Sequence, residues 1–346
     1  MEQYGTAAKT SVHRFACALA PRVKAVAIAG WCIGTLLATP MGTARAETAY
    51  PSRTVQLIIA YGAGTVGDVS MRVVAEKLST KLGKPFIVDN RPGPGGIVAA
   101  KGAAAAIPDG HTLLLTGNSY AISTALFKSL PYNAVTDFAP ISTVATFDML
   151  VFTRAGSPLK TMQDIVNNAK ANPGKMFVAT LSPGTTPFLA VELFKTVTGV
   201  DVTAVPFRTS GDVSTAVLRG DVDLAMEFYA PQQALIQDKK LEVIATTGRK
   251  RAYYLPDVPT VIESGIADFE VTSWNGIVAP AGTPQPVIDT LSKAIAEALE
   301  SPEAQETGKR LGMEMRGGTP DELATRLKND IAKWSDLVET AKIPKL

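Results

Sequence analysis

The chain has 346 residues, of which 46% are hydrophobic and 19% charged, and its 34 basic and 32 acidic residues give a formal net charge of +2. A chain of this size can bury a large core, and chains beyond about 250 residues usually divide into two units. The near-neutral balance without basic blocks gives no electrostatic indication of binding to nucleic acid or to an anionic membrane surface.

The first 46 residues have the pattern of a secretory signal peptide. Basic residues precede a nearly uncharged stretch at residues 25–40, and Ala44-Arg45-Ala46 has small residues at both positions that cleavage requires. The apolar stretch is shorter than the roughly 20 residues that span a bilayer as a helix. We expect cleavage after Ala46 and export to the periplasm as a soluble protein, with a retained anchor as the alternative.

Cleavage would remove five basic residues and one acidic residue, which leaves 29 basic against 31 acidic, a net charge of −2. It would also remove Cys17, Cys32 and His13. A disulfide, a zinc site with nitrogen and sulfur ligands, and a Cys-His nucleophile pair are then excluded from the mature chain. The remaining histidine, His111, is expected at the surface of a turn. We expect no metal, no cofactor and no catalytic residue.

Short apolar runs alternate with helical patterns after the signal peptide, which predicts an α/β fold with a sheet covered by helices. The first unit reads as strands at 55–60, 86–88 and 113–116, with helices at 69–82 and 97–105. A second unit follows, with strands at 141–145, 149–152, 176–179, 203–205, 224–226 and 243–246, and helices at 162–171, 188–198 and 213–218.

The C-terminal part reads as three helices, at 284–300, 302–311 and 320–340. Each is expected to begin with a capping residue followed by proline, namely Thr283, Ser301 and Thr319, and Glu322 completes a capping box with Thr319. Trp334 belongs to an apolar stripe at helical spacing, which predicts core packing.

The loop from Gly62 to Asp68 lies between a predicted strand and a predicted helix and reads G-x-G-x-x-G. With Asp89 at the end of the next strand, it matches a dinucleotide-binding fingerprint. The same turn exposes backbone N–H groups at a helix start, which bind phosphates or carboxylates alike. Asp68 would place a negative charge beside a pyrophosphate, and the export signal also argues against NAD. A purely structural turn, with Asp68 capping the helix, is the third interpretation.

A similar loop, Thr180 to Pro187, recurs in the second unit between a strand and a helix. Its hydroxyls and backbone amides are uncharged donors suited to a carboxylate, although a helix-capping role is equally compatible. Further polar turns could line a cleft: residues 117–120, residues 207–211, where Arg208 could grip a second carboxylate, and residues 227–229, at a strand end.

An ordered series of motifs runs along the whole mature chain. They are Ala60-Tyr61 with the glycine-rich loop, Asp89-Asn90-Arg91-Pro92-Gly93, Pro108-Asp109-Gly110, Leu130-Pro131-Tyr132, Asp137-Phe138-Ala139-Pro140, Leu255-Pro256-Asp257-Val258-Pro259-Thr260 and Trp274-Asn275-Gly276 through Pro284. In this order they resemble the Bug-type receptors, the substrate-binding proteins of tripartite tricarboxylate transporters.

The resemblance implies a periplasmic-binding-protein-like fold of two α/β lobes with a ligand cleft between them. Lobe 1 would comprise residues 47–146 and 275–346, and lobe 2 residues 147–274. The family's ligand is held by the first loop of each lobe, here Gly64 to Asp68 and Thr180 to Thr186. With the polar turns, the candidate ligand-binding residues are Tyr61, Gly64, Thr65, Val66, Gly67, Asp68, Ser119, Thr180, Gly184, Thr185, Thr186, Phe188, Phe207, Arg208, Glu227 and Phe228.

The chain also departs from the family pattern. Phe188 stands where a histidine is common, and Phe207-Arg208 replaces a common tyrosine-lysine pair. With Tyr120 and Phe228 also near cleft positions, an aromatic or bulky carboxylate is expected to fit as well as citrate would.

The first hypothesis is therefore a monomeric, non-enzymatic receptor that passes a small carboxylate to a membrane permease or presents it to a sensor. The alternatives are an NAD-dependent oxidoreductase that uses Gly62 to Gly67, and a secreted scaffold without a ligand.

Overall fold

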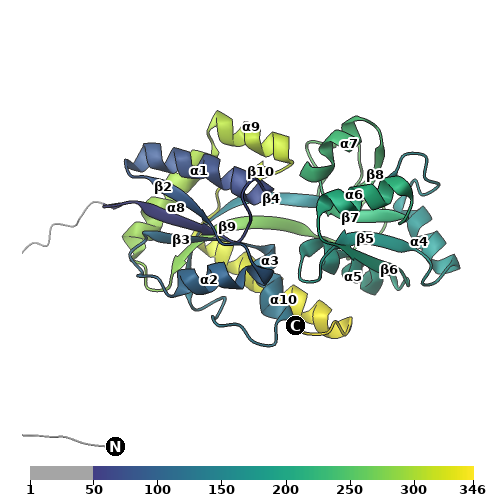
Figure 1. The fold of residues 1–346 in the computed structure, drawn as a ribbon, viewed down its shortest axis with the longest axis horizontal. Coiled ribbons are helices and arrows are strands. Elements are labelled where there is room, and N and C mark those ends of the chain that lie inside the picture. The colour runs from purple at the N-terminus through teal and green to yellow at the C-terminus, as the bar shows by residue number, and fades with distance from the viewer. Residues whose placement is uncertain (1–49) are drawn as a thin grey trace, which may run out of the picture. The chain divides into compact units, whose positions relative to one another are not determined.

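The computed structural model describes residues 50–346, so the predicted signal peptide with its cysteines and cleavage site lies outside the described residues. Two triplets of parallel strands, each with helical crossovers, carry the fold (Figure 1). In the first, β1 (Val55–Ile59) lies between β2 (Phe86–Asn90) and β3 (Thr112–Gly117). In the second, β5 (Phe177–Leu181) lies between β6 (Thr203–Phe207) and β7 (Leu224–Phe228).

Two long strands connect the triplets into one mixed sheet. β4 (Phe138–Arg154) pairs antiparallel with β9 (Thr272–Pro280) up to Asp148, and from Met149 it pairs with β7 and with β8 (Leu241–Thr246). β9 pairs in turn with β3, which gives the order β2-β1-β3-β9-β4-β7-β5-β6; β10 (Glu314–Met315) adds to β4. The change of partner along β4 divides the sheet into a first and a second half.

Helices cover both faces of the sheet. The crossover and covering helices are α1 (Val66–Leu82), α2 (Ile97–Ala104), α3 (Asn118–Leu126), α4 (Met162–Ala171), α5 (Thr186–Thr198), α6 (Ser210–Arg219), α7 (Gln233–Gln237), α8 (Gln285–Leu299), α9 (Pro302–Leu311) and α10 (Pro320–Thr340), with short 3-10 turns at Pro94–Gly96 and Ala230–Gln232. No helix among residues 50–346 is long and apolar enough to cross a membrane.

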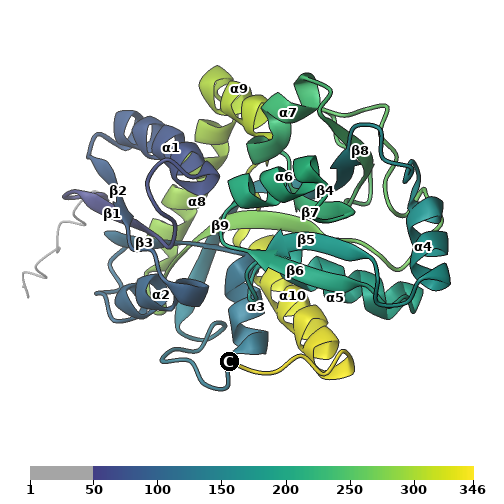
Figure 2. The same cartoon turned by 45° about the vertical axis from the view of Figure 1, so that its right-hand side comes forward.

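The alternation of side chains along the strands assigns the core to three clusters. In β1, Leu57 and Ile59 pack with α1 and α8, whereas Ile58 points to the opposite face, with α2 and α3. In β4, Leu150 and Phe152 pack toward α6, and the neighbouring side chains point to the opposite face. The α2, α3, α5 and α10 face therefore carries one continuous core across both halves, while the α1 and α6 face carries two separate clusters. Figures 1 and 2 both show α10 running beneath the sheet beside α3.

The predicted α/β fold is confirmed, and most expected elements are present within a few residues. The caps at Ser301 and Thr319, including the capping box with Glu322, are confirmed by their hydrogen bonds. Thr283 is not a cap, because α8 begins at Gln285 and the Thr283 hydroxyl donates to Pro280 O. Trp334 is buried, as its spacing predicts.

Three further local predictions are wrong. The two strands at 141–145 and 149–152 are one strand, β4, interrupted by irregularities in register. Residues 117–120 are not a turn, because α3 begins at Asn118. His111 is buried rather than at a turn surface, and its Nε2 accepts a hydrogen bond from Ser52 N at 3.1 Å.

Candidate functional site

The loops that follow β1 and β5 have the same local geometry. Thr65 and Thr185 are the N-caps of α1 and α5, and each hydroxyl donates at 2.8 Å to the carbonyl oxygen three residues earlier, Gly62 O or Ser182 O. The glycine before each cap has a positive φ, +79° for Gly64 and +89° for Gly184, which side chains rarely adopt. Each loop therefore turns sharply and presents the free N–H groups of a helix start.

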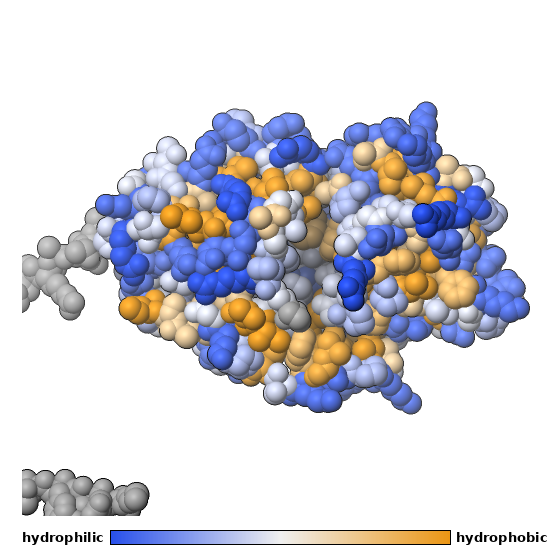
Figure 3. All heavy atoms as spheres, in the orientation of Figure 1, coloured by the Kyte–Doolittle hydropathy of each residue, from blue (hydrophilic) through white to orange (hydrophobic). Residues whose placement is uncertain are grey.

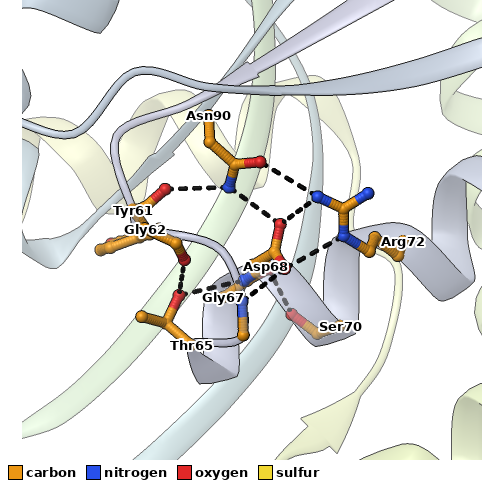
Figure 4. A network of polar contacts seen from close by, with 9 residues as sticks. Tyr61, Gly62, Thr65, Gly67, Asp68, Ser70, Arg72 and Asn90 are labelled. Atoms are coloured by element: carbon orange, nitrogen blue, oxygen red, sulfur yellow. Dashed lines mark hydrogen bonds and ion pairs between the residues drawn. The ribbon is translucent and has the colours of Figure 1, made fainter.

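Asp68 holds the first loop in place from behind. Its carboxylate accepts hydrogen bonds from Gly64 N at 2.8 Å, Asn90 Nδ2 at 2.8 Å and Arg72 Nε at 3.0 Å (Figure 4). These bonds, that from Arg72 first, lower the pKa of Asp68 to about 2. Thr65, not Asp68, is the cap: α1 begins at Val66, and the Thr65 hydroxyl accepts from Asp68 N. The interpretation of Asp68 as the capping residue is wrong.

Gly67 allows the Tyr61 ring to lie against the start of α1. A Cβ at this position would lie 2.7 Å from Cδ2 of Tyr61. The Tyr61 hydroxyl in turn lies 3.4 Å from Ser119 Oγ, in the first turn of α3. The loop, the tyrosine and the start of α3 are thus packed as one unit.

Two further helix starts reach the same region. Asn118, the first residue of α3, donates from Nδ2 to Thr186 Oγ1 at 3.1 Å, which joins the starts of α3 and α5 directly. The indole of Trp334 donates to Asn118 Oδ1 at 2.8 Å and fixes the amide orientation. At the start of α6, the Ser210 hydroxyl donates to Glu227, a buried side chain whose pKa is raised by burial.

A cavity of about 590 Å³ lies between these helix starts. Its polar wall comes from the first residues of α1, α3, α5 and α6 together with Asn275 and Ser273 of β9. Its apolar wall is Tyr61, Val66, Phe147, Leu181, Pro187, Phe228, Tyr229, Ala230, Pro231 and Leu311. Figure 3 shows the surface hollowed between the two ends of the sheet. Within residues 50–346, no Lys, Arg or His side chain lines it, and Asp148 is its charged residue.

The cavity wall therefore offers helix N-termini and hydroxyls in place of cationic side chains. Aligned backbone dipoles and free N–H groups at helix starts attract anions. The remaining wall is apolar and aromatic, with the rings of Phe147 and Phe228 at a centroid distance of 5.2 Å. This arrangement suits a small anion with an apolar body.

Comparison with known proteins agrees with this geometry. Residues 70–343 match the TctC family, described as tripartite tricarboxylate transporter family receptor. The chain belongs to this receptor family. Protein BugT of Bordetella pertussis is 31% identical over 310 residues, which cover 88% of this chain and 95% of BugT. The TctC family comprises solute-binding receptors and not enzymes, so the oxidoreductase alternative is wrong.

Solved structures of similar chains support the same fold. The periplasmic binding protein BugD has a TM-score of 0.73 at 31% identity, over 86% of this chain and 100% of BugD. The structure of R. palustris Rpa4515 with adipate has a TM-score of 0.76 at 30% identity, and the match covers 86% of this chain and 100% of Rpa4515. The structure of MatC (Rpa3494) from Rhodopseudomonas palustris with bound malate has a TM-score of 0.71 at 28% identity, and the match covers 84% of this chain and 100% of MatC. The periplasmic-binding-protein-like fold is thus shown, and two of these neighbours, Rpa4515 and MatC, are in complex with a carboxylate.

The fingerprint acid also has a structural role in this TctC chain. Asp89 Oδ2 accepts hydrogen bonds from Gln56 Nε2 at 2.7 Å and from Arg91 Nε at 2.8 Å. A carboxylate held in this way is not free to bind a ribose. The dinucleotide pattern of Gly62 to Gly67 is here the pattern of a strand-to-helix turn.

The structure brings nine of the sequence-predicted residues to the cavity wall: Tyr61, Gly64, Thr65, Val66, Gly67, Ser119, Thr185, Thr186 and Phe228. The other candidates lie elsewhere. Asp68, Thr180 and Glu227 are buried behind the wall; Gly184 shapes its loop; Phe188 and Phe207 pack against core clusters; and Arg208 is exposed. Tyr120, proposed for an aromatic pocket, is buried against Tyr132 and Phe138.

Several residues of the cavity wall were not among the sequence-predicted candidates. Phe147 and Asp148 lie inside β4, Leu311 and Gly312 come from the end of α9, and Asn275 comes from β9. Tyr229 belongs to the strand-end segment 227–229 that the sequence offers as cleft lining, and it lines the cavity. For Leu311 and Gly312 no local pattern indicates a ligand cavity, because their position depends on the packing of α9 beside α1.

Proposed function

We propose that this chain captures a small organic carboxylate in the cavity and delivers it to the membrane permease of a tripartite transporter, or presents it to a sensor. The observation that carries the proposal is the convergence of four helix starts, among residues 50–346, on one cavity without a cationic side chain. Such donors can bind a carboxylate without the desolvation of a buried cation. The adipate and malate in the neighbouring structures support this ligand class.

The proposed binding residues fall into two matched loops. Gly64 to Gly67 would contact the ligand from one side and Thr185 with Thr186 from the other, because both helix starts present backbone N–H groups that have no intrahelical acceptor. Ser119 would add a hydroxyl from the start of α3. Asp68 acts as a positioning residue, since its carboxylate holds Gly64 N.

The two lobes are proposed to be residues 47–146 with 275–346, and residues 147–274. The exchange of partner along β4 at Asp148 and Met149 supports the first boundary. The second boundary would fall within β9, the other strand that joins the halves. We also propose export with cleavage after Ala46 and a monomeric receptor, and the mass of the mature chain isolated from periplasm would test the cleavage.

A binding experiment tests the ligand class. Thermal unfolding would be followed with aliphatic and aromatic carboxylates, with the amide of each acid as a matched ligand control, and with NAD. A ligand at about 100 times its Kd adds roughly 2.7 kcal/mol of stability, which raises Tm by several degrees. We expect a shift with at least one carboxylate and none with its amide. A shift with NAD alone, or with amides and acids alike, would refute the proposal.

The variant Arg208→Gln tests whether the exposed arginine contributes to ligand binding. Because Arg208 does not line the cavity, we expect its substitution to leave carboxylate affinity unchanged within about twofold. A larger loss would bring Arg208 back among the ligand-binding residues.

A further inference from the structure

Asp148 is the charged residue of the cavity wall in the described part of the chain. It lies on β4 at the last position that pairs with β9, opposite Thr272, and Met149 then pairs with Phe228 of β7. The neighbouring Phe147 and Phe228 both line the cavity. Asp148 therefore stands in the connection between the halves, within an aromatic part of the wall.

One oxygen of this carboxylate is held and the other is free. The Thr272 hydroxyl donates to Asp148 Oδ1 at 2.8 Å. Among residues 50–346, no hydrogen bond or ion pair ends on Oδ2. Gly248 packs so closely that a Cβ there would lie 2.2 Å from Oδ2, which restricts the rotation of the carboxylate. The cavity wall thus carries a carboxylate whose Oδ2 accepts no hydrogen bond from the described residues.

No residue in the described part of the chain forms an ion pair with Asp148. Glu270, which precedes β9, and Glu314 of β10 oppose its ionisation; Arg326 of α10 favours it but is hydrogen-bonded to Thr272 O at 3.1 Å. The negative charge of Asp148 also contributes to the raised pKa of Tyr254, which follows β8. Burial is the largest effect and raises the pKa of Asp148 to about 6. At pH 7.5 the carboxylate is therefore mostly ionised.

We propose that Asp148 selects carboxylates that carry a second group able to donate a hydrogen bond, such as a hydroxyl or an amine, and disfavours dicarboxylates. This rests on the proposed function and adds its substrate class. The helix starts would hold the ligand's carboxylate, and Oδ2 of Asp148 would accept the hydrogen bond. A second carboxylate in the same cavity meets a like charge in a partly desolvated site, which costs affinity. The chain would then differ in preference from the neighbours with adipate and malate.

Calorimetric titration at pH 7.5 with matched ligands tests the proposal. The aromatic set is benzoate, 3- and 4-hydroxybenzoate, isophthalate and terephthalate; the aliphatic set is butyrate, 4-hydroxybutyrate and succinate. The measured quantity is the ratio of the Kd of each dicarboxylate to the Kd of its hydroxy acid. We expect at least one set to bind, with a ratio of about ten or more.

Asp148→Asn removes the charge and keeps the shape and an acceptor oxygen. We expect the ratio to fall about tenfold in this variant, chiefly through tighter binding of the dicarboxylate. Glu314→Gln is the matched control, because it removes a nearby charge from outside the cavity wall and should leave the ratio within about twofold. An unchanged ratio in Asp148→Asn, or a wild-type preference for the dicarboxylate, would overturn the proposal.

A pH titration of the wild-type protein keeps the test valid if the variant does not fold. Between pH 7.5 and pH 5 Asp148 gains a proton and can donate to a carboxylate, so the ratio should fall toward that of the variant. A ratio of the two Kd values that does not change with pH would contradict the proposed role of Asp148 in ligand selection. Failure of every acid to bind would instead refute carboxylate binding itself, so the two failures are distinguishable.

Discussion

Asp68→Asn is expected to destabilise the protein by about 2 kcal/mol through the first loop. Asp68 is 2% exposed, and its pKa is about 2 in the folded protein against an ordinary value of 3.8. At about 1.36 kcal/mol for each pKa unit, the folded state stabilises the charged form by about 2.4 kcal/mol. Asparagine keeps the size of the side chain but loses this charge, and Tm should fall by roughly 5 °C.

The pH dependence of this difference follows from the direction of the pKa shift. A lowered pKa contributes stability above the unfolded pKa, and the contribution is lost as pH falls through the folded pKa. The difference in unfolding free energy between wild type and Asp68→Asn should therefore be about 2.4 kcal/mol at pH 5 and about 1.3 kcal/mol at pH 3.

Denaturant unfolding followed by circular dichroism at both pH values measures this difference. Asp212→Asn is the matched control, because Asp212 is also the third residue of a helix capped by threonine but is exposed. Asp212→Asn should lower the free energy of unfolding clearly less than Asp68→Asn does. A cost below 0.5 kcal/mol for Asp68→Asn, or a difference that does not change between pH 5 and pH 3, would refute the role of Asp68 in positioning the loop.

Three further substitutions test residues that line the cavity or support its wall from behind. Gly67→Ala should weaken carboxylate binding at least tenfold, because its Cβ would displace the Tyr61 ring, whereas Gly62→Ala has open space and should bind normally in the same titration. Asn118→Ala leaves a buried indole N–H and the Thr186 hydroxyl without their partner, so denaturant unfolding should show a loss of about 1–3 kcal/mol, and an unaltered midpoint would contradict this. Glu227→Gln should become progressively more stable than wild type as pH rises above about 4.5, since burial raises the pKa of Glu227 and the folded state resists its ionisation; parallel stability profiles from pH 4 to pH 8 would exclude this.

Local chemistry made some elements predictable from the sequence. The caps at Ser301 and Thr319 depend on residues within one helical turn, so proline at the first helical position and Glu322 were sufficient. The two loops were also predictable, because a glycine between an apolar strand and a helix indicates a sharp turn. The family motifs added the fold and the receptor class, which no single loop could establish.

Other features depend on contacts between distant segments. Asn118 and Ser119 are typical turn residues, yet they begin α3, where Trp334 and Thr186 bind the Asn118 side chain from α10 and α5. Asp148 lies within a β-strand pattern, and only the exchange of partner along β4 places it at a cavity. No periodicity in the sequence encodes such positions.

The unequal faces of the sheet have a mechanical consequence. On the face of α3, α5 and α10, apolar side chains pack continuously across both halves. Separating the two halves on this face would expose apolar surface to water, at a free-energy cost of about 25 cal/mol for each Å². On the face of α1 and α6 the two clusters are independent, so widening the cavity on that side breaks no shared core. Opening of the cavity would therefore break only local contacts on the side of α1 and α6, such as the hydrogen bond from the Tyr253 hydroxyl to Met313 O, and would leave the continuous core beside α10 intact.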